Sequence, residues 1–178
     1  SDSNTISHNF ILGNEILLWD NSDYNILSDN NKGNTSSTNY ASVLIISSDH
    51  SSYNKIIGNS FSNIKLQYQS TNKTIIENNT CSSISLIFDA EDNSINNNTC
   101  NGSISISGDD NTITNNTIYG LSIGTGGDSN KITNNTIFGS AVVEGTSNNF
   151  TNNVVTNSSS YGIFVKYNFG NTFYKNTV

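Results

Sequence analysis

The chain has no proline, methionine or arginine, and its 178 residues include only two cysteines and one tryptophan. Seven lysines oppose fourteen acidic residues, which gives a net charge of −7. Without a basic patch, nucleic-acid binding is not expected. No apolar run approaches the roughly 18 residues of a membrane-spanning helix, so no membrane span is expected either. The missing methionine predicts a processed mature form, as after removal of a secretory signal, or an excised fragment.

Only 33% of the residues are hydrophobic, a level at which a polar chain can remain disordered. A repeat argues against disorder. The template N-x-h-x-x-N-x-h, with h apolar, recurs nine times at steps of 18 to 29 residues. It is broken at two places, where Thr74 replaces a first-place asparagine and Lys32 an eighth-place apolar residue. Its first place falls at residues 4, 25, 54, 74, 93, 111, 130, 148 and 171.

The sixth place of the template is always asparagine, and the third place is always apolar. The nine asparagines are Asn9, Asn30, Asn59, Asn79, Asn98, Asn116, Asn135, Asn153 and Asn176. Because 34 of the 178 residues are asparagine, abundance alone explains some matches, but it does not explain nine at one phase. At a sharp corner, an inward asparagine can bond to the next asparagine amide to amide. The pattern therefore predicts an internal Asn ladder.

A second apolar pair at alternate positions follows each template except the last, as in Ile84/Leu86 and Ile104/Ile106. Such alternation is typical of a strand with one buried face. One repeat cannot bury its own apolar side, whereas stacked repeats form a continuous core. The sequence thus predicts an all-β, single-stranded, right-handed parallel β-helix of about nine coils. We expect one domain over residues 1–178, and about 4.8 Å per coil gives a rod on the order of 40 Å long.

These repeats resemble the right-handed parallel β-helix repeats of pectate-lyase-like and NosD-like proteins. In character they are most similar to Asn/Thr-rich, adhesin-like surface proteins of archaea. The resemblance covers essentially the whole chain. It implies a fold, but that fold serves lyases, hydrolases, epimerases, adhesins and structural rods alike.

The two cysteines, Cys81 and Cys100, occupy the eighth place of adjacent repeats. Stacking would bring their Cα atoms about 4.8 Å apart, inside the window of about 4.4 to 6.8 Å for a disulfide. Two readings remain open: a disulfide, or two buried thiols acting as small apolar residues. No metal site is expected from two sulfurs without a nearby histidine.

Nine N-x-S/T sequons are candidate N-glycosylation sites. They begin at Asn34, Asn72, Asn78, Asn97, Asn101, Asn115, Asn134, Asn149 and Asn157. Four of them share the place just before the ladder asparagine, where a corner residue would point outward. These four could carry a stripe of glycans along one edge.

Acidic residues precede several templates. Asp92, Asp110 and Asp128 lie one or two residues before a template start, so we expect them to stack as one acidic column. Such a column could bind Ca²⁺, or it could consist of hydrated turn residues. The second reading is favoured, so no cofactor is predicted.

Asp109-Asp110 resembles the paired acids of polygalacturonase-type β-helix hydrolases. Those enzymes also need a further aspartate, a histidine and an arginine, and this chain has no arginine. Pectate-lyase-type elimination lacks its arginine base for the same reason. We therefore predict no enzyme, with a polysaccharide lyase or hydrolase of the β-helix class as a less favoured function.

The chain begins directly with the repeat and ends after the first strand of its last coil, and neither end has a candidate cap. From this we expect a non-enzymatic extracellular structural protein, a subunit or segment of a cell-surface filament, sheath or surface layer that assembles head-to-tail with copies of itself. The alternative is an adhesin-like module that binds a surface polysaccharide or a cell. Its candidate contact aromatics are Trp19, Tyr161, Tyr167 and Phe169. Ice binding ranks third, because only one file of threonines is seen.

Overall fold

A computed structural model describes residues 2–11, 15–19, 21–32, 42–46, 51–67, 72–88, 90–166 and 169–178. For residues 15 and 42–46 it describes the backbone. All regular elements in these ranges are short strands, and no helix there could cross a membrane. The all-β prediction is confirmed.

The first sheet has nine parallel strands, one from each repeat, and each covers places two to four of the template. They are β1 (Thr5–Ser7), β4 (Ile26–Ser28), β7 (Lys55–Ile57), β9 (Ile75–Glu77), β12 (Ser94–Asn96), β15 (Thr112–Thr114), β18 (Lys131–Thr133), β21 (Asn149–Thr151) and β24 (Thr172–Tyr174). The nine repeats read from the sequence are therefore nine successive layers of this sheet.

The second sheet is narrow and is formed by places seven and eight. Its strands are β2 (Phe10–Ile11), β5 (Asn31–Lys32), β10 (Thr80–Cys81), β13 (Thr99–Cys100), β16 (Thr117–Ile118), β19 (Thr136–Ile137) and β22 (Val154–Val155). Isolated parallel bridges at Ser60 join β5 to β10, so the two groups of strands lie along one face.

The third sheet has eight strands and contains the second apolar pair of each repeat. Its strands are β3 (Glu15–Trp19), β6 (Ser42–Ile46), β8 (Asn63–Gln67), β11 (Ser83–Ile87), β14 (Ser103–Ile106), β17 (Gly120–Ile123), β20 (Ala141–Val143) and β23 (Ile163–Val165). Each complete coil thus visits three sheets in turn.

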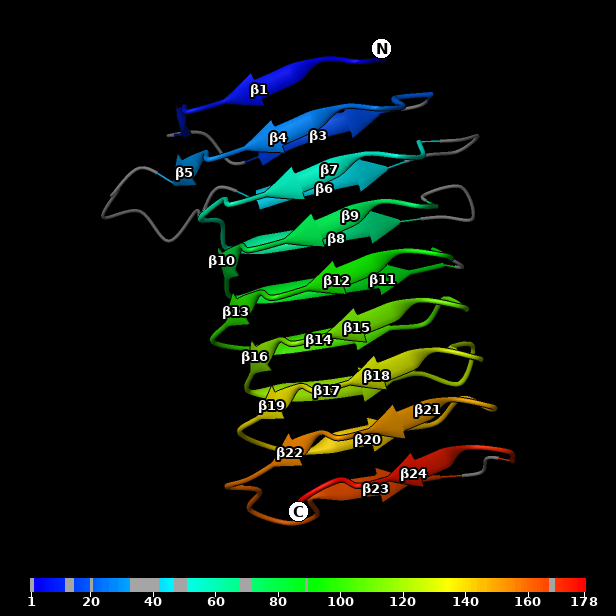
Figure 1. Ribbon diagram of the computed structural model, residues 1–178. Helices are drawn as coiled ribbons and strands as arrows, with labels where there is room; N and C mark the ends of the chain where they lie inside the picture. The colour runs from blue at the N-terminus through cyan, green and yellow to red at the C-terminus, as the bar shows by residue number, and fades with distance from the viewer. Residues whose placement is uncertain are drawn as a thin grey trace.

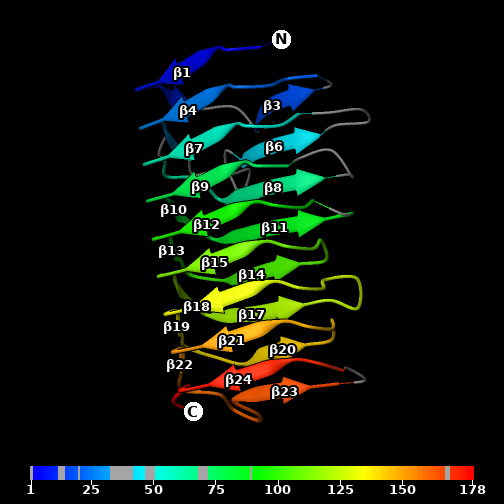
Figure 2. The ribbon, with the colours of Figure 1, turned by 45° about the vertical axis from the view of Figure 1, so that its right-hand side comes forward.

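The chain winds around a straight axis, with the first sheet and the third sheet on opposite sides (Figure 1). Seen from the N-terminal end it turns clockwise as it moves away, which makes the solenoid right-handed as predicted; the rotated view shows the same sense (Figure 2). The register follows the template, since Ile95 pairs with Ile76 on one side and with Ile113 on the other. Equivalent places therefore stack directly.

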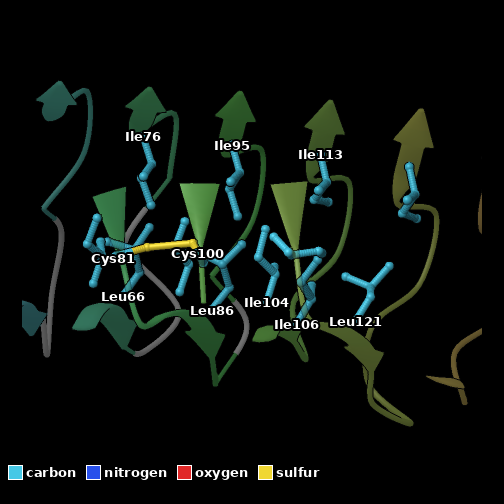
Figure 3. Close-up of a cluster of buried hydrophobic side chains, with 14 of the residues drawn as sticks. Leu66, Ile76, Cys81, Leu86, Ile95, Cys100, Ile104, Ile106, Ile113 and Leu121 are labelled. Carbon is cyan, nitrogen blue, oxygen red and sulfur yellow. A yellow bond between two sulfur atoms is a disulfide. The ribbon is translucent and has the colours of Figure 1, made fainter. Parts of the chain in front are cut away.

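The core is a set of apolar columns, one per inward place. Figure 3 shows Ile76, Ile95 and Ile113 of the first sheet pointing toward Leu86 and Ile106 of the third. All five are at most 2% exposed. Complete burial of each such side chain contributes roughly 1.5–3 kcal/mol, so a thin column suffices for a polar chain.

Three expected core positions of the last two repeats are exposed. Phe173, at the third place of the template, is 39% exposed, and Val178, at the eighth place, is 72% exposed. Val165 of β23 is 43% exposed, although the alternation placed it inward with Ile163. Within the described residues β23 is an edge strand that pairs with β20 alone, so its side chains are covered from one side.

Candidate functional site

The predicted ladder of sixth-place asparagines is confirmed. Each Nδ2 donates to the Oδ1 of the ladder asparagine in the next coil, at 3.0–3.1 Å, from Asn9 through to Asn176. The backbone N–H of each also donates to that same Oδ1, at 2.9–3.1 Å. From Asn30 to Asn153 these side chains are at most 1% exposed. The corner between the first two sheets is therefore held by one continuous amide network.

A second ladder runs along the first place of the template, at the corner that leads into the first sheet. The backbone N–H of Asn4 donates to Asn25 Oδ1 at 2.9 Å, and the pattern continues to Asn171. Sequence reasoning gave this place no role, although asparagine fills it in eight of nine repeats. The frequency of asparagine at this place was the signal in the sequence that could have revealed the second ladder.

Each ladder asparagine follows a residue in the left-handed backbone region. Asn97, before Asn98, has φ 55°, and Asp92, before Asn93, has φ 54°. The same holds at both corners of all nine repeats. Asparagine, aspartate and glycine tolerate this conformation best, which explains why the fifth place is rich in them. The polar corners are thus selected by backbone geometry.

Thr74 interrupts the second ladder, because it stands where the other repeats have asparagine. It is fully buried, and among the described residues its Oγ1 has no hydrogen-bond partner. Thr74→Asn would supply an Oδ1 to the N–H of Asn54 in the preceding coil. We expect the free energy of unfolding to rise by about 1 kcal/mol, measured by urea denaturation. Thr80→Asn, at an exposed place, is the control and should change it by less than about 0.5 kcal/mol. A Thr74→Asn variant no more stable than this control would contradict the ladder role.

The acidic residues do not form the single column expected from sequence. Asp92 and Asp110 stand one residue before the template, whereas Asp128 stands two before it and stacks on Asp109 instead. Asp109 Oδ1 accepts the Asp128 N–H at 2.7 Å, and Asp128 Oδ1 accepts the Thr146 N–H at 2.6 Å. The prediction of one column was wrong because spacing to the template start varies by one residue. The Asp109 and Asp128 carboxylates serve as acceptors for turn backbone.

The same role recurs near the N-terminus, where Asp2 Oδ1 accepts the N–H of Asp23 and Asp23 Oδ1 accepts that of Ser52. Among the described residues, no group of three or more His, Cys, Asp or Glu is placed to hold a metal ion. Of the candidate acid pair Asp109 and Asp110, Asp109 accepts a backbone N–H from the turn of the next coil.

Cys81 and Cys100 lie side by side in β10 and β13, with Cα atoms 4.6 Å apart. The structure joins them in a disulfide that points into the core (Figure 3). Both are at most 5% exposed. The bond therefore connects two neighbouring coils at a core position.

The four sequons before the ladder are exposed at their asparagines, Asn78, Asn97, Asn115 and Asn134. Asn97 Nδ2 donates to Asn78 Oδ1 at 2.6 Å, so the file is partly linked by its own amides. Asn101, Asn149 and Asn157 are also exposed and Asn72 is half-buried, whereas Asn34 lies outside the described residues. The file gives one edge of the rod a row of candidate acceptors.

The candidate contact aromatics project outward. Trp19 is 55% exposed beside the buried Leu18, and Tyr161 and Phe169 are 61% and 84% exposed. Tyr167 lies outside the described residues. Tyr161 stacks on Phe164 with ring centroids 5.1 Å apart. The rings are accessible, and one of them is held in place by a neighbour.

Two further aromatic pairs escaped sequence reasoning. Tyr24 stacks on Tyr53 at 4.9 Å, and Tyr119 lies 5.7 Å from Phe138. Each pair joins the same place of adjacent repeats, so aligning the residues that flank the template would have found both.

A groove opens on the face of the second sheet, with a volume of about 170 Å³. Among the described residues its lining is formed by Lys32, Ser60, Phe61, Thr80, Cys81, Ser82, Thr99 and Asn101. Sequence reasoning identified Lys32 only as a break in the template. A second hollow lies between Val178 and the turn that contains Asn157 and Ser158.

No protein-family model matches this chain, and no curated protein matches it significantly. Among solved structures it is similar to HetL, a pentapeptide repeat protein involved in heterocyst differentiation regulation from the cyanobacterium Nostoc sp. strain PCC 7120. The sequence identity is 11% and the TM-score 0.26, over 99% of this chain and 87% of the other.

Proposed function

We propose that this chain is a non-enzymatic extracellular structural rod, a subunit or segment of a cell-surface filament, sheath or surface layer. The observation that carries the proposal is the pair of Asn ladders, which runs through all nine layers with one break. Such a network resists bending and shear, because each coil is bonded to the next at two corners as well as in three sheets. The likeness to Asn/Thr-rich archaeal surface proteins points in the same direction.

Two other features support a location outside the cell. A disulfide such as Cys81–Cys100 persists in oxidising compartments. The exposed sequon file at Asn78, Asn97, Asn115 and Asn134 would present glycans along one edge of a surface glycoprotein.

Head-to-tail assembly would use the bonds that already join the coils. The N–H at the template's second place donates to the first-place carbonyl of the preceding coil, as from Ile26 to Asn4 at 2.8 Å. In an assembled pair, the Thr5 N–H of one copy would donate in the same way to the Asn171 carbonyl of another. Because this contact is heterologous, it would propagate as a filament.

The test is electron microscopy of the purified protein and of native surface material. We expect fibres with an axial repeat near the rod length, on the order of 40 Å plus one junction. Thr5→Pro removes the N–H that β1 would offer to another copy, so this variant should remain monomeric. Thr5→Val keeps that N–H and is the matched control. A monodisperse wild-type monomer, or fibres that persist unchanged in Thr5→Pro, would overturn head-to-tail assembly.

The second candidate is an adhesin-like module that binds a carbohydrate or a cell. It is favoured by the exposed rings of Trp19, Tyr161 and Phe169. Binding to a glycan array that is lost in Trp19→Ala or Tyr161→Ala, with assembly unaffected, would support it.

A further inference from the structure

Asn101 forms the only Asn-Gly dipeptide of the sequence, although 34 of the 178 residues are asparagine. Asparagine is chemically labile, because the backbone nitrogen of the next residue can attack its side-chain amide carbon. Glycine favours this attack, since it has no Cβ to obstruct the approach and its backbone is the most mobile. In a folded protein, the attack also requires that this backbone nitrogen is not held in a hydrogen bond.

The ladder asparagines are protected by the stacking of the coils. From the second coil onward, the residue after each sixth-place asparagine donates its N–H to the ladder asparagine carbonyl of the preceding coil, as from Thr99 to Asn79 at 2.9 Å. The residue after each first-place asparagine donates in the same way to the first-place carbonyl of the preceding coil, as from Thr112 to Asn93 at 2.8 Å. The attacking nitrogens are therefore held in place.

The exposed asparagines of the sequon file, Asn78, Asn97, Asn115 and Asn134, are protected as well. Each is followed by a ladder asparagine, whose N–H donates to the Oδ1 of the ladder asparagine in the next coil at 2.9 Å. Exposure of the side chain is thus not sufficient for the attack.

Asn101 differs from both groups. It is exposed and lies in the turn between β13 and β14. Its N–H donates to the Cys81 carbonyl at 3.0 Å, and the Gly102 carbonyl accepts the Tyr119 N–H at 2.9 Å. Among the described residues, neither the Gly102 N–H between these two bonds nor the Asn101 side-chain amide has a hydrogen-bond partner. Glycine is required here, because a Cβ at position 102 would lie 2.5 Å from the Ser82 carbonyl oxygen.

We propose that Asn101 is a site of spontaneous deamidation in the folded rod. The Gly102 backbone nitrogen bonds to Asn101 Cγ, and the bond from Cγ to the side-chain nitrogen breaks. The proton of the Gly102 N–H passes through solvent to the departing nitrogen, which leaves as ammonia, and a succinimide ring remains. Water then opens the ring at either of its carbonyls, which gives aspartate or isoaspartate.

Isoaspartate would weaken the rod at the fifth coil. It places an additional carbon atom in the backbone between the Asn101 N–H, which bonds to Cys81, and the Gly102 carbonyl, which bonds to Tyr119. These two bonds join the turn to the coils on either side, so a longer backbone between them cannot keep both in register. The fold thus contains a site of chemical ageing that its own requirement for glycine maintains.

The test follows deamidation in the native protein, made in a host without N-glycosylation because Asn101 begins a sequon. The protein is incubated in mildly alkaline buffer, and conversion is measured by peptide mass spectrometry and isoaspartyl methyltransferase labelling. We expect conversion at Asn101 to be at least about tenfold faster than at any other asparagine, because glycine leaves the attack unobstructed. In urea with a reductant, the ladder residues Asn59 and Asn93, each followed by serine, should be converted as well.

Asn101→Gln is the matched variant, because glutamine keeps the amide but would have to close a larger ring. We expect no conversion at position 101 in this variant, and an unchanged denaturation midpoint after incubation, whereas the midpoint of the incubated wild type should fall. Asn149→Gln, at an exposed place of the first sheet, is the control and should leave conversion at Asn101 unchanged. An intact Asn101 after incubation, or equal conversion of ladder asparagines in the native protein, would overturn the site. An equal fall of the midpoint in Asn101→Gln would overturn the weakening by isoaspartate.

Discussion

Asn98→Ala should destabilise the protein by about 3–5 kcal/mol, the largest effect expected from a single substitution. Asn98 Oδ1 accepts from both the N–H and the Nδ2 of Asn79, and its Nδ2 donates to the Ile76 carbonyl at 2.9 Å and to Asn116 Oδ1 at 3.0 Å. With alanine at position 98, the Asn79 N–H loses its acceptor. Because Asn79 is 1% exposed, the unpaired N–H remains buried. An unpaired buried donor is more destabilising than the loss of an exposed bond.

The measurement is the free energy of unfolding by guanidinium denaturation, followed by far-ultraviolet circular dichroism. Asn97→Gly is the matched control, since Asn97 is exposed and its φ of 55° suits glycine. We expect this control to change stability by less than about 1 kcal/mol. Equal effects of the two variants would show that the ladder contributes nothing specific at this corner.

Cys81→Ala/Cys100→Ala should lower the free energy of unfolding by about 3–5 kcal/mol. A disulfide that closes a loop of 19 residues contributes about 3 kcal/mol by restricting the unfolded chain. The remainder comes from the space left in the core, because both side chains are at most 5% exposed.

Cys81→Val/Cys100→Val separates the bond from the packing. Valine fills the place, as Val155 does in a later coil, so this pair should lose only the contribution of the bond. Thiol titration of the unreduced wild type should find no free cysteine. Two titratable thiols, together with a denaturation midpoint that a reductant does not move, would contradict the disulfide.

Much of the fold could be predicted because a solenoid is close to one-dimensional. The third place and the sixth place each recur nine times, and each has one neighbour above and one below. A residue such as Ile95 therefore needs only a match with Ile76 and Ile113, which sequence spacing reveals. The stacking of Cys81 on Cys100 followed from the same arithmetic.

The segments that flank the template resisted prediction, because their length differs between repeats. Asp128 was assigned to the file of Asp92 and Asp110, yet it stacks on Asp109, one residue away. The Tyr119–Phe138 and Tyr24–Tyr53 pairs were missed for the same reason. Outside the template, register is decided by how each turn closes.

The sequence by itself determined the stacking of the coils, the apolar columns and the sixth-place ladder, since these depend on periodicity and on the identity of single places. Only the tertiary structure decided which backbone groups the first-place asparagines and the turn carboxylates accept from, and that residues of four coils line one groove on the second sheet. Hydrogen bonds are directional and grooves are formed by several coils together, so both depend on coordinates that a linear pattern does not contain.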